Sequence, residues 1–230
     1  MADDHAALEA FRLADSALPV GTNSISYGLE RFVEAGRVAD VSDLRALLET
    51  YLRNQVGTAD LVALRAAHAA ARDDDVAGIR DADRRLNAAT VPAEFRESAT
   101  RSGARLLSLQ RDLRSDPLLD AYADAVDDGT APGTYPAVLG AVTGRAGVGE
   151  RRACLACCHG FLTGLLGAAQ RLLPAGHTAV QRTLDDLRPT IRAAVDDSAD
   201  RTLDGMTSFT PLVDVLSAEH ERADRRLFLS

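Results

Sequence analysis

Residues 150–173 constrain the fold more than any other part of the chain, because they form its most apolar segment. His159, Thr163 and Gln170 interrupt this segment, so it falls short of the roughly 20 apolar residues that cross a membrane. Gly160, Gly164 and Ala168 share one helical face, which lets a second helix approach closely. The sequence predicts a central helix here, in the core or at a dimer seam, and no membrane contact. Gly140 and Gly144 mark another helix that comes close to a neighbour.

Helical spacing of apolar residues extends over most of the chain, whereas no segment alternates convincingly as a strand would. Ala, Leu and Val dominate and aromatic residues make up only 4%, a composition that favours helices packed through small side chains. The pattern predicts helices over residues 42–56, 61–72, 76–89, 92–114 and 117–126 and one that ends at Asp197, with a break at Gly57, caps at Ser42, Thr58 and Asp60, and a kink near Pro189. We expect residues 1–230 to form one all-α domain, a bundle of about ten helices.

The charged residues restrict the class of partner. The chain has no lysine, all 26 cationic residues are Arg, and 25 Asp accompany 9 Glu, which gives a formal net charge of −8. Excess carboxylates keep a surface hydrated at high salt, so the composition suggests a halophilic cytoplasm, although a GC-rich genome would also explain the missing lysines. The acidic balance argues against nucleic acid as a partner, because phosphate binding needs a basic face.

The N-terminus and the cysteines indicate a reducing, cytoplasmic compartment. The chain begins acidic and lacks the basic and apolar regions of a signal peptide. Cys154, Cys157 and Cys158 imply no disulfide framework. They share a helical face and thiolates bind soft metals, so an all-α metal-binding or redox protein is an alternative function. We favour buried packing for the cysteines, which are common in apolar helices, and a structural role for His68, so no metal ligand is assigned.

A turn rich in polar residues separates two helical patterns near the N-terminus. The first pattern runs through Leu8, Phe11, Arg12 and Asp15, and the second through Leu29, Phe32, Val33 and Gly36. Pro19 and Gly21 end the first pattern, since proline fixes φ and glycine permits a positive φ. Asn23, Ser24 and Ser26 then offer side-chain oxygens to the free N–H groups of the next helix. On composition alone, this string predicts a helical corner with a polar cap.

Several blocks of the sequence resemble the urease accessory protein UreF family. The first block is the turn itself, Leu18-Pro19-Val20-Gly21, followed by Ser24-x-Ser26-x-Gly28-Leu29-Glu30. Later blocks lie at residues 94–107, 135–142 and 172–181, and the ending Arg226-Leu-Phe-x-Ser230 is similar to the C-terminal signature of the family. The resemblance covers nearly the whole chain and includes no catalytic motif.

The resemblance implies a non-enzymatic scaffold without a cofactor, expected as a homodimer. Such a scaffold binds a second accessory protein, UreD (also called UreH), and recruits the GTPase UreG, so that nickel reaches apo-urease. The resemblance also implies that residues 218–230 are a tail that partner binding orders. The partner-binding residues that it indicates are Pro19, Gly21, Asn23, Ser24, Ser26, Tyr27, Glu30, His220, Glu221, Arg226 and Phe228.

The chain departs from the family pattern within the first signature. The family carries an aromatic residue where this sequence has Asn23, and we expect Tyr27 to replace part of the lost apolar contact. The sequence also lacks a P-loop, a nucleotide-binding glycine pattern and a nucleophile paired with a base. These features agree with a scaffold rather than an enzyme.

Overall fold

The computed structural model describes residues 2–15, 17–21, 27–208 and 210–211, and within these ranges it contains helices and no strand. In chain order the α-helices are α1 (Ala2–Ala14), α2 (Leu29–Glu34), α3 (Val41–Tyr51), α4 (Leu61–Arg72), α5 (Val76–Ala89), α6 (Ala93–Leu113), α7 (Pro117–Asp127), α8 (Tyr135–Arg145), α9 (Glu150–Leu172), α10 (His177–Asp186) and α11 (Arg188–Asp197). A π-helix, η2 (Leu52–Asp60), joins α3 to α4, and a short 3-10 helix, η3 (Leu203–Gly205), follows α11. The all-α class predicted from the sequence is confirmed.

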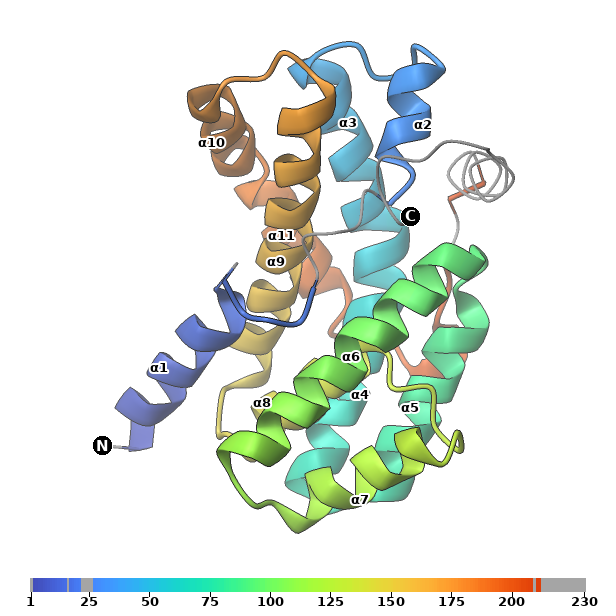
Figure 1. The fold of residues 1–230 in the computed structure, drawn as a ribbon, viewed down its shortest axis with the longest axis vertical. Coiled ribbons are helices and arrows are strands. Elements are labelled where there is room, and N and C mark those ends of the chain that lie inside the picture. Colours follow the sequence, from blue (N-terminus) through green and yellow to red (C-terminus); the bar gives the residue numbers. More distant parts are fainter. Residues whose placement is uncertain (1, 16, 22–26, 209, 212–230) are drawn as a thin grey trace.

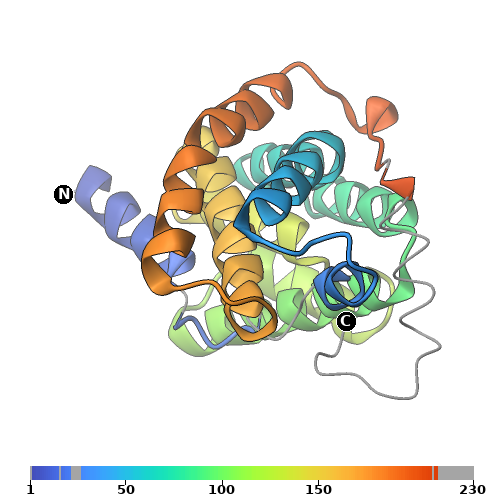
Figure 2. The same ribbon diagram turned by 90° about the horizontal axis from the view of Figure 1, so that it is seen from above.

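Helix α9 is the central element of the fold (Figure 1). It contacts α1, α2, α4, α8, α10 and α11, and from above α10 and α11 lie on one side of it and α4 on the other (Figure 2). By length and composition α9 is apolar enough to cross a membrane, contrary to the expectation from its polar interruptions, but 56% of its most apolar window is buried inside the fold. It is a core helix, and the prediction of a central helix is confirmed.

The closest helix contact lies between α4 and α8. A Cβ atom added to Gly140 would lie 2.2 Å from the carbonyl oxygen of Leu64, and one added to Gly144 would lie 2.7 Å from that of His68. The two backbones therefore touch at these glycines, as the sequence predicted. In α9, by contrast, no described atom comes within 4 Å of a Cβ added to Gly160, so this end of the small-residue stripe makes no close helix contact.

Helix α3 and the segment after it differ from their predicted form. The cap of α3 is Asp40, whose carboxylate accepts from the backbone N–H of Ser42 at 2.8 Å, so the prediction of Ser42 as the cap is wrong. The predicted break at Gly57 is also wrong, because η2 carries the helix through to Asp60. Gly57 serves packing instead, since a Cβ added there would lie 3.2 Å from Ala194 of α11.

Several predicted helix ends agree with the structure, and one does not. Helices α5 and α9 match the predicted ranges, and Asp116 caps α7 by accepting from the backbone N–H of Leu118 at 3.0 Å. The predicted kink near Pro189 is a complete break, because α10 ends at Asp186 and α11 begins at Arg188 with proline in its first turn. Proline is favoured at that position, since the N–H that it lacks has no helical partner there.

Helix α1 projects from one side of the molecule in both views and packs against α9 (Figures 1 and 2). Its buried face consists of Ala6, Glu9 and Leu13. Leu8 and Phe11, which carried the helical pattern in the sequence, are 67% and 72% exposed. The periodicity therefore identified the helix but not the face that it buries.

Candidate functional site

Tyr27 brings four parts of the fold together next to the first signature. Its φ of +48° is rare for a residue with a side chain. Its carbonyl oxygen accepts a hydrogen bond from the hydroxyl of Tyr51, at the end of α3. Its ring meets Phe95 of α6 edge to face at a centroid distance of 5.0 Å, and Phe161 of α9 at 4.9 Å. Tyr27 is thus fixed by both its backbone and its ring.

A cavity of about 60 Å³ opens beside this ring, and we call it the Tyr27 cavity. Its walls come from η2, α5, α6, α8, α9 and the segment before α2. The residues that line it are Tyr27, Gln55, Asp60, Leu86, Asn87, Thr90, Phe95, Arg96, Ala99, Thr134, Tyr135, Pro136, Cys157, Gly160 and Phe161. A mostly apolar cavity with a few convergent polar groups is the usual form of a binding site.

Asp60 is the acidic side chain of the Tyr27 cavity. It is the last residue of η2 and is half-buried, and no hydrogen bond or ion pair reaches its carboxylate from the described ranges of the chain. Burial raises the pKa of Asp60 to about 7, because the ionised form loses its hydration. π-Helices are frequent at functional sites, and here the π-helix carries both Gln55 and Asp60 to the cavity.

The opposite rim of the Tyr27 cavity depends on two fixed groups. The guanidinium Nη1 of Arg96 donates to the carbonyls of Thr90 at 2.7 Å and Val91 at 2.5 Å. The buried carboxylate of Asp83 accepts from the backbone N–H of Gly133 at 2.7 Å and of Thr134 at 2.8 Å, and from the Thr134 hydroxyl at 2.7 Å. Asp83 thereby fixes the loop that leads into α8. It also fixes Thr134, which lines the cavity.

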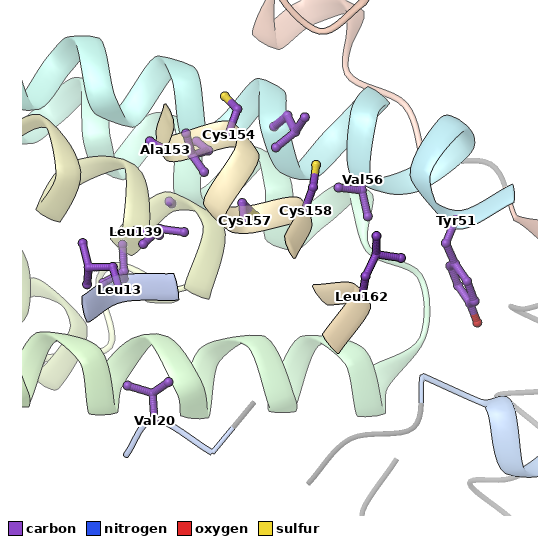
Figure 3. Close-up of a cluster of buried hydrophobic side chains, with 14 of the residues drawn as sticks. Leu13, Val20, Tyr51, Val56, Leu139, Ala153, Cys154, Cys157, Cys158 and Leu162 are labelled. Atoms are coloured by element: carbon purple, nitrogen blue, oxygen red, sulfur yellow. The ribbon is translucent and has the colours of Figure 1, made fainter. Parts of the chain in front are cut away.

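The three cysteines are buried core residues of α9. Figure 3 shows Cys158 and Leu162 beside Val56 where α9 meets η2. Burial raises the pKa of Cys154 to about 11 and also raises those of Cys157 and Cys158 well above the usual value, so all three stay protonated at neutral pH. The nucleophilic, metal-binding form of cysteine is the thiolate. Across the described residues, no three His, Cys, Asp or Glu side chains are grouped so that they could hold a metal ion.

The structure places four of the predicted partner-binding residues. Pro19 is exposed, and Gly21 has a φ of +80° and packs beneath Arg105 of α6, whose Nη1 would lie 2.1 Å from an added Cβ. Tyr27 lies in the aromatic cluster described above, and Glu30 of α2 is only 4% exposed. The other predicted residues, Asn23, Ser24, Ser26, His220, Glu221, Arg226 and Phe228, lie outside the described ranges.

The start of α2 tests only part of the predicted polar cap, because Asn23, Ser24 and Ser26 lie outside the described ranges. Helix α2 begins after Gly28, which has a φ of +74° and, as a glycine, has no side chain that could form a cap hydrogen bond. The N-cap position therefore belongs to a glycine in the left-handed region rather than to one of the polar residues of the signature. Gly28 suits this position because it has no Cβ to clash with the backbone.

Sequence reasoning missed the aromatic cluster around Tyr27. The chain has only four Tyr and six Phe residues, and five of these ten meet at or beside the cavity: Tyr27, Tyr51, Phe95, Tyr135 and Phe161. The low number of aromatic residues was the one available signal of a shared site, because each aromatic side chain supplies a large contact area. Their sequence spacing gave no indication that they converge.

Comparison with known proteins assigns the chain to a family. The UreF family profile matches residues 38–188. Urease accessory protein UreF of Trichodesmium erythraeum is 34% identical over 221 residues, which cover 96% of this chain and 95% of that protein. Urease accessory protein UreF 1 of Brucella melitensis is 33% identical over 223 residues, with 97% and 92% covered. Urease accessory protein UreF of Yersinia enterocolitica is 33% identical over 221 residues, with 96% of each covered.

The helical fold and these similarities define a non-catalytic accessory protein rather than an enzyme. The similarity extends over nearly the full length of both partners in each comparison. The chain belongs to the UreF family of urease accessory proteins. The resemblance noted in the first signature and in the later sequence blocks is thereby confirmed.

Proposed function

We propose that this protein is a cytoplasmic scaffold for urease maturation, which binds UreD (UreH) and recruits the GTPase UreG so that nickel reaches apo-urease. The observation that carries the proposal is the near full-length similarity to UreF proteins, at 33–34% identity. The scaffold acts as a homodimer and transfers no chemical group itself. In this proposal the nickel ion is cargo, and the chain supplies surfaces rather than ligands.

The first partner surface lies at the corner formed by Pro19, Gly21 and Tyr27. Pro19 is exposed, whereas Gly21 and Tyr27 are each held by packing from α6 or α9. A surface segment held by buried neighbours keeps one shape, which lowers the entropy cost of binding. Asn23, Ser24 and Ser26 belong to this surface by their place in the signature.

Glu30 of α2 has a buried side chain. It therefore supports this surface from the protein interior. The test is Glu30→Ala, with Glu34→Ala as the matched control on the same helix. Glu34 is exposed and pairs with Arg31 at 2.7 Å. Glu30→Ala is expected to abolish UreG recruitment in a pull-down of the UreD complex, and Glu34→Ala to preserve it. Equal recruitment by both variants would remove Glu30 from the site.

The second partner surface is the C-terminal tail, residues 218–230, which UreD orders on binding. Arg226 supplies a bidentate contact to a carboxylate or to main-chain carbonyls, and Phe228 supplies an apolar anchor. His220 and Glu221 complete the surface. Lysine at position 226 would lack the fork geometry of the guanidinium.

Deletion of residues 225–230 tests the tail. The truncated protein is expected to keep its helix content and thermal midpoint but to lose assembly with UreD or UreG. Co-purification of tagged chain with UreD and UreG homologues from the same organism measures assembly, and circular dichroism measures the midpoint. If the truncated protein loses several degrees of thermal midpoint yet still assembles, the tail packs against the core of its own chain and is not a partner surface.

A further inference from the structure

The Tyr27 cavity holds polar groups that nothing in the described chain satisfies. Asp60, Tyr27 and Tyr135 line it, and no hydrogen bond to their side-chain oxygens comes from the described residues. All three residues are half-buried, so a water or a ligand that enters the cavity can bond to these oxygens. A carboxylate accepts hydrogen bonds only, and a phenol oxygen also accepts. The cavity therefore presents acceptors to whatever enters it.

The walls of the Tyr27 cavity also favour positive charge. Tyr27, Phe95, Tyr135 and Phe161 line it, and the ring of Tyr27 contacts the rings of both phenylalanines. Aromatic faces carry negative charge density and attract ammonium and guanidinium groups, most strongly where water is excluded. Asp60 lines the same cavity, so the site combines aromatic rings with one acidic side chain.

We propose that the Tyr27 cavity binds one organic cation, an ammonium or guanidinium group, with Asp60 as its counter-ion and the aromatic rings as its walls. Both groups are rich in N–H donors and lack acceptors, so they complement the carboxylate and the phenol oxygens. The volume of about 60 Å³ has room for roughly four water-sized groups, which matches the head of such a cation. An anion would meet the ionised Asp60, and a purely apolar group would leave the acceptors unsatisfied.

Arg96 provides an internal check on the sign of the charge. Its guanidinium lines the cavity, donates to the carbonyls of Thr90 and Val91, and makes no ion pair with Asp60. Its positive charge therefore opposes a bound cation and would favour an anion. Arg96→Gln should strengthen the binding of a cation, whereas every proposal of an anionic ligand requires it to weaken binding.

Binding depends on pH through Asp60. Burial raises the pKa of Asp60 to about 7, and a cation needs the ionised form. The other titratable groups that face Asp60 are Tyr27, Cys157 and Cys158, whose pKa values burial raises, so they stay neutral near pH 7. Tyr135, which also lines the cavity, behaves in the same way. Arg96 is the other charged residue of the lining. Affinity should therefore fall as pH drops below 7, by about tenfold per pH unit well below that value.

The cation has two possible sources, a free small molecule or an arginine side chain of another protein. The probes are methylguanidinium and methylammonium, with N-methylurea as the neutral molecule of matching shape. The capped tripeptide acetyl-Gly-Arg-Gly-amide presents the same group on a backbone. Binding of the tripeptide as tightly as methylguanidinium indicates a protein side chain, and exclusion of the tripeptide alone indicates a free small cation.

Isothermal titration calorimetry and ring-proton NMR shifts of the full chain measure binding. We expect saturable binding of at least one cation, little binding of N-methylurea, about tenfold or greater weakening by Asp60→Asn, and strengthening by Arg96→Gln. The comparison uses each variant only if its circular dichroism midpoint is not lower than that of the wild type. The proposal is overturned if no cation binds saturably, if N-methylurea binds equally well, or if binding is insensitive to Asp60→Asn.

Discussion

The hydroxyl of Tyr51 donates a hydrogen bond to the main-chain carbonyl of Tyr27, which joins the end of α3 to the segment before α2. Tyr51 is fully buried, and Tyr27 has a φ of +48°. A residue with a Cβ pays about 1 kcal/mol or more for that conformation. The hydrogen bond and the two ring contacts of Tyr27 offset this cost, so the shape of the candidate partner surface depends on a residue 24 positions further along the chain.

Removing the Tyr51 hydroxyl should therefore destabilise the protein. Tyr51→Phe leaves the Tyr27 carbonyl without this donor and is expected to cost about 1–2 kcal/mol, a midpoint lower by about 2–8 °C. Tyr135→Phe is the matched control, because its hydroxyl lines the Tyr27 cavity and receives no hydrogen bond from the described residues. Scanning calorimetry of both variants makes the comparison. An equal midpoint for the two would show that the Tyr51 bond contributes nothing.

The backbone contact between α4 and α8 should tolerate no side chain. Gly140→Ala places a Cβ 2.2 Å from the Leu64 carbonyl, and since backbone cannot move aside cheaply we expect a loss of about 3 kcal/mol. Gly167→Ala in α9 is the control, because no described atom lies within 4 Å of its added Cβ. Alanine there should gain up to about 1 kcal/mol from helix propensity. Urea denaturation curves measure both, and destabilisation of similar size in the two variants would contradict the packing argument.

Asp83 should be essential to the loop that leads into α8. It accepts hydrogen bonds from two backbone N–H groups and one hydroxyl, whereas asparagine would turn an N–H₂ group toward some of these donors. Asp83→Asn is expected to lower the free energy of unfolding by about 2–3 kcal/mol. Asp81→Asn on the same helix changes only an exposed pair with Arg85 at 2.9 Å, and should stay within about 0.5 kcal/mol. A smaller effect at Asp83 than at Asp81 would refute its role.

Asp60 should make stability fall with rising pH near neutrality. Burial raises its folded-state pKa from 3.8 to about 7, so the folded state holds the proton more tightly than the unfolded state. The carboxyl therefore costs nothing below pH 3.8 and progressively more as pH rises to about 7. Asp60→Asn should match the wild type at pH 4 and exceed it at pH 8 by about 2 kcal/mol, roughly half the full conversion because solvent reaches the cavity. Parallel stability curves across this range would contradict the assignment.

Glu9 should produce the opposite dependence at acid pH. Burial by itself would raise its pKa, but hydrogen bonds and charge from Arg12 and Arg114 lower it below the usual value of 4.5. A lowered folded-state pKa stabilises the protein above 4.5 and loses that contribution as pH falls through the folded value. Glu9→Gln should thus narrow the difference in midpoint between pH 6 and pH 3 by a few degrees. An unchanged difference would place Glu9 outside the acid transition.

The local pattern of the sequence determined much of the helical structure. Residues 76–89 and 150–172 form the predicted helices because their apolar spacing and their flanking residues act within one turn. Gly140 and Gly144 indicated a close approach to a neighbouring helix for a similarly local reason, since two small residues on one face leave room for a backbone. The structure identifies that neighbour as α4. The family signatures near both ends could also be recognised from the sequence, because each consists of residues that are contiguous in the chain.

Tertiary structure decided what depends on distant residues. Gly57 predicts a helix break from the sequence, yet it lies inside η2 and packs closely against Ala194. The contact with α9 decides which face of α1 is buried. The apolar spacing that included Phe11 therefore predicted the helix but not its buried face, because Phe11 is exposed. The Tyr27 cavity depends most on distant residues, because its walls come from segments between residues 27 and 161. Chain folding alone brings Asp60 into a half-buried position among aromatic rings, and only there does its carboxyl acquire a raised pKa.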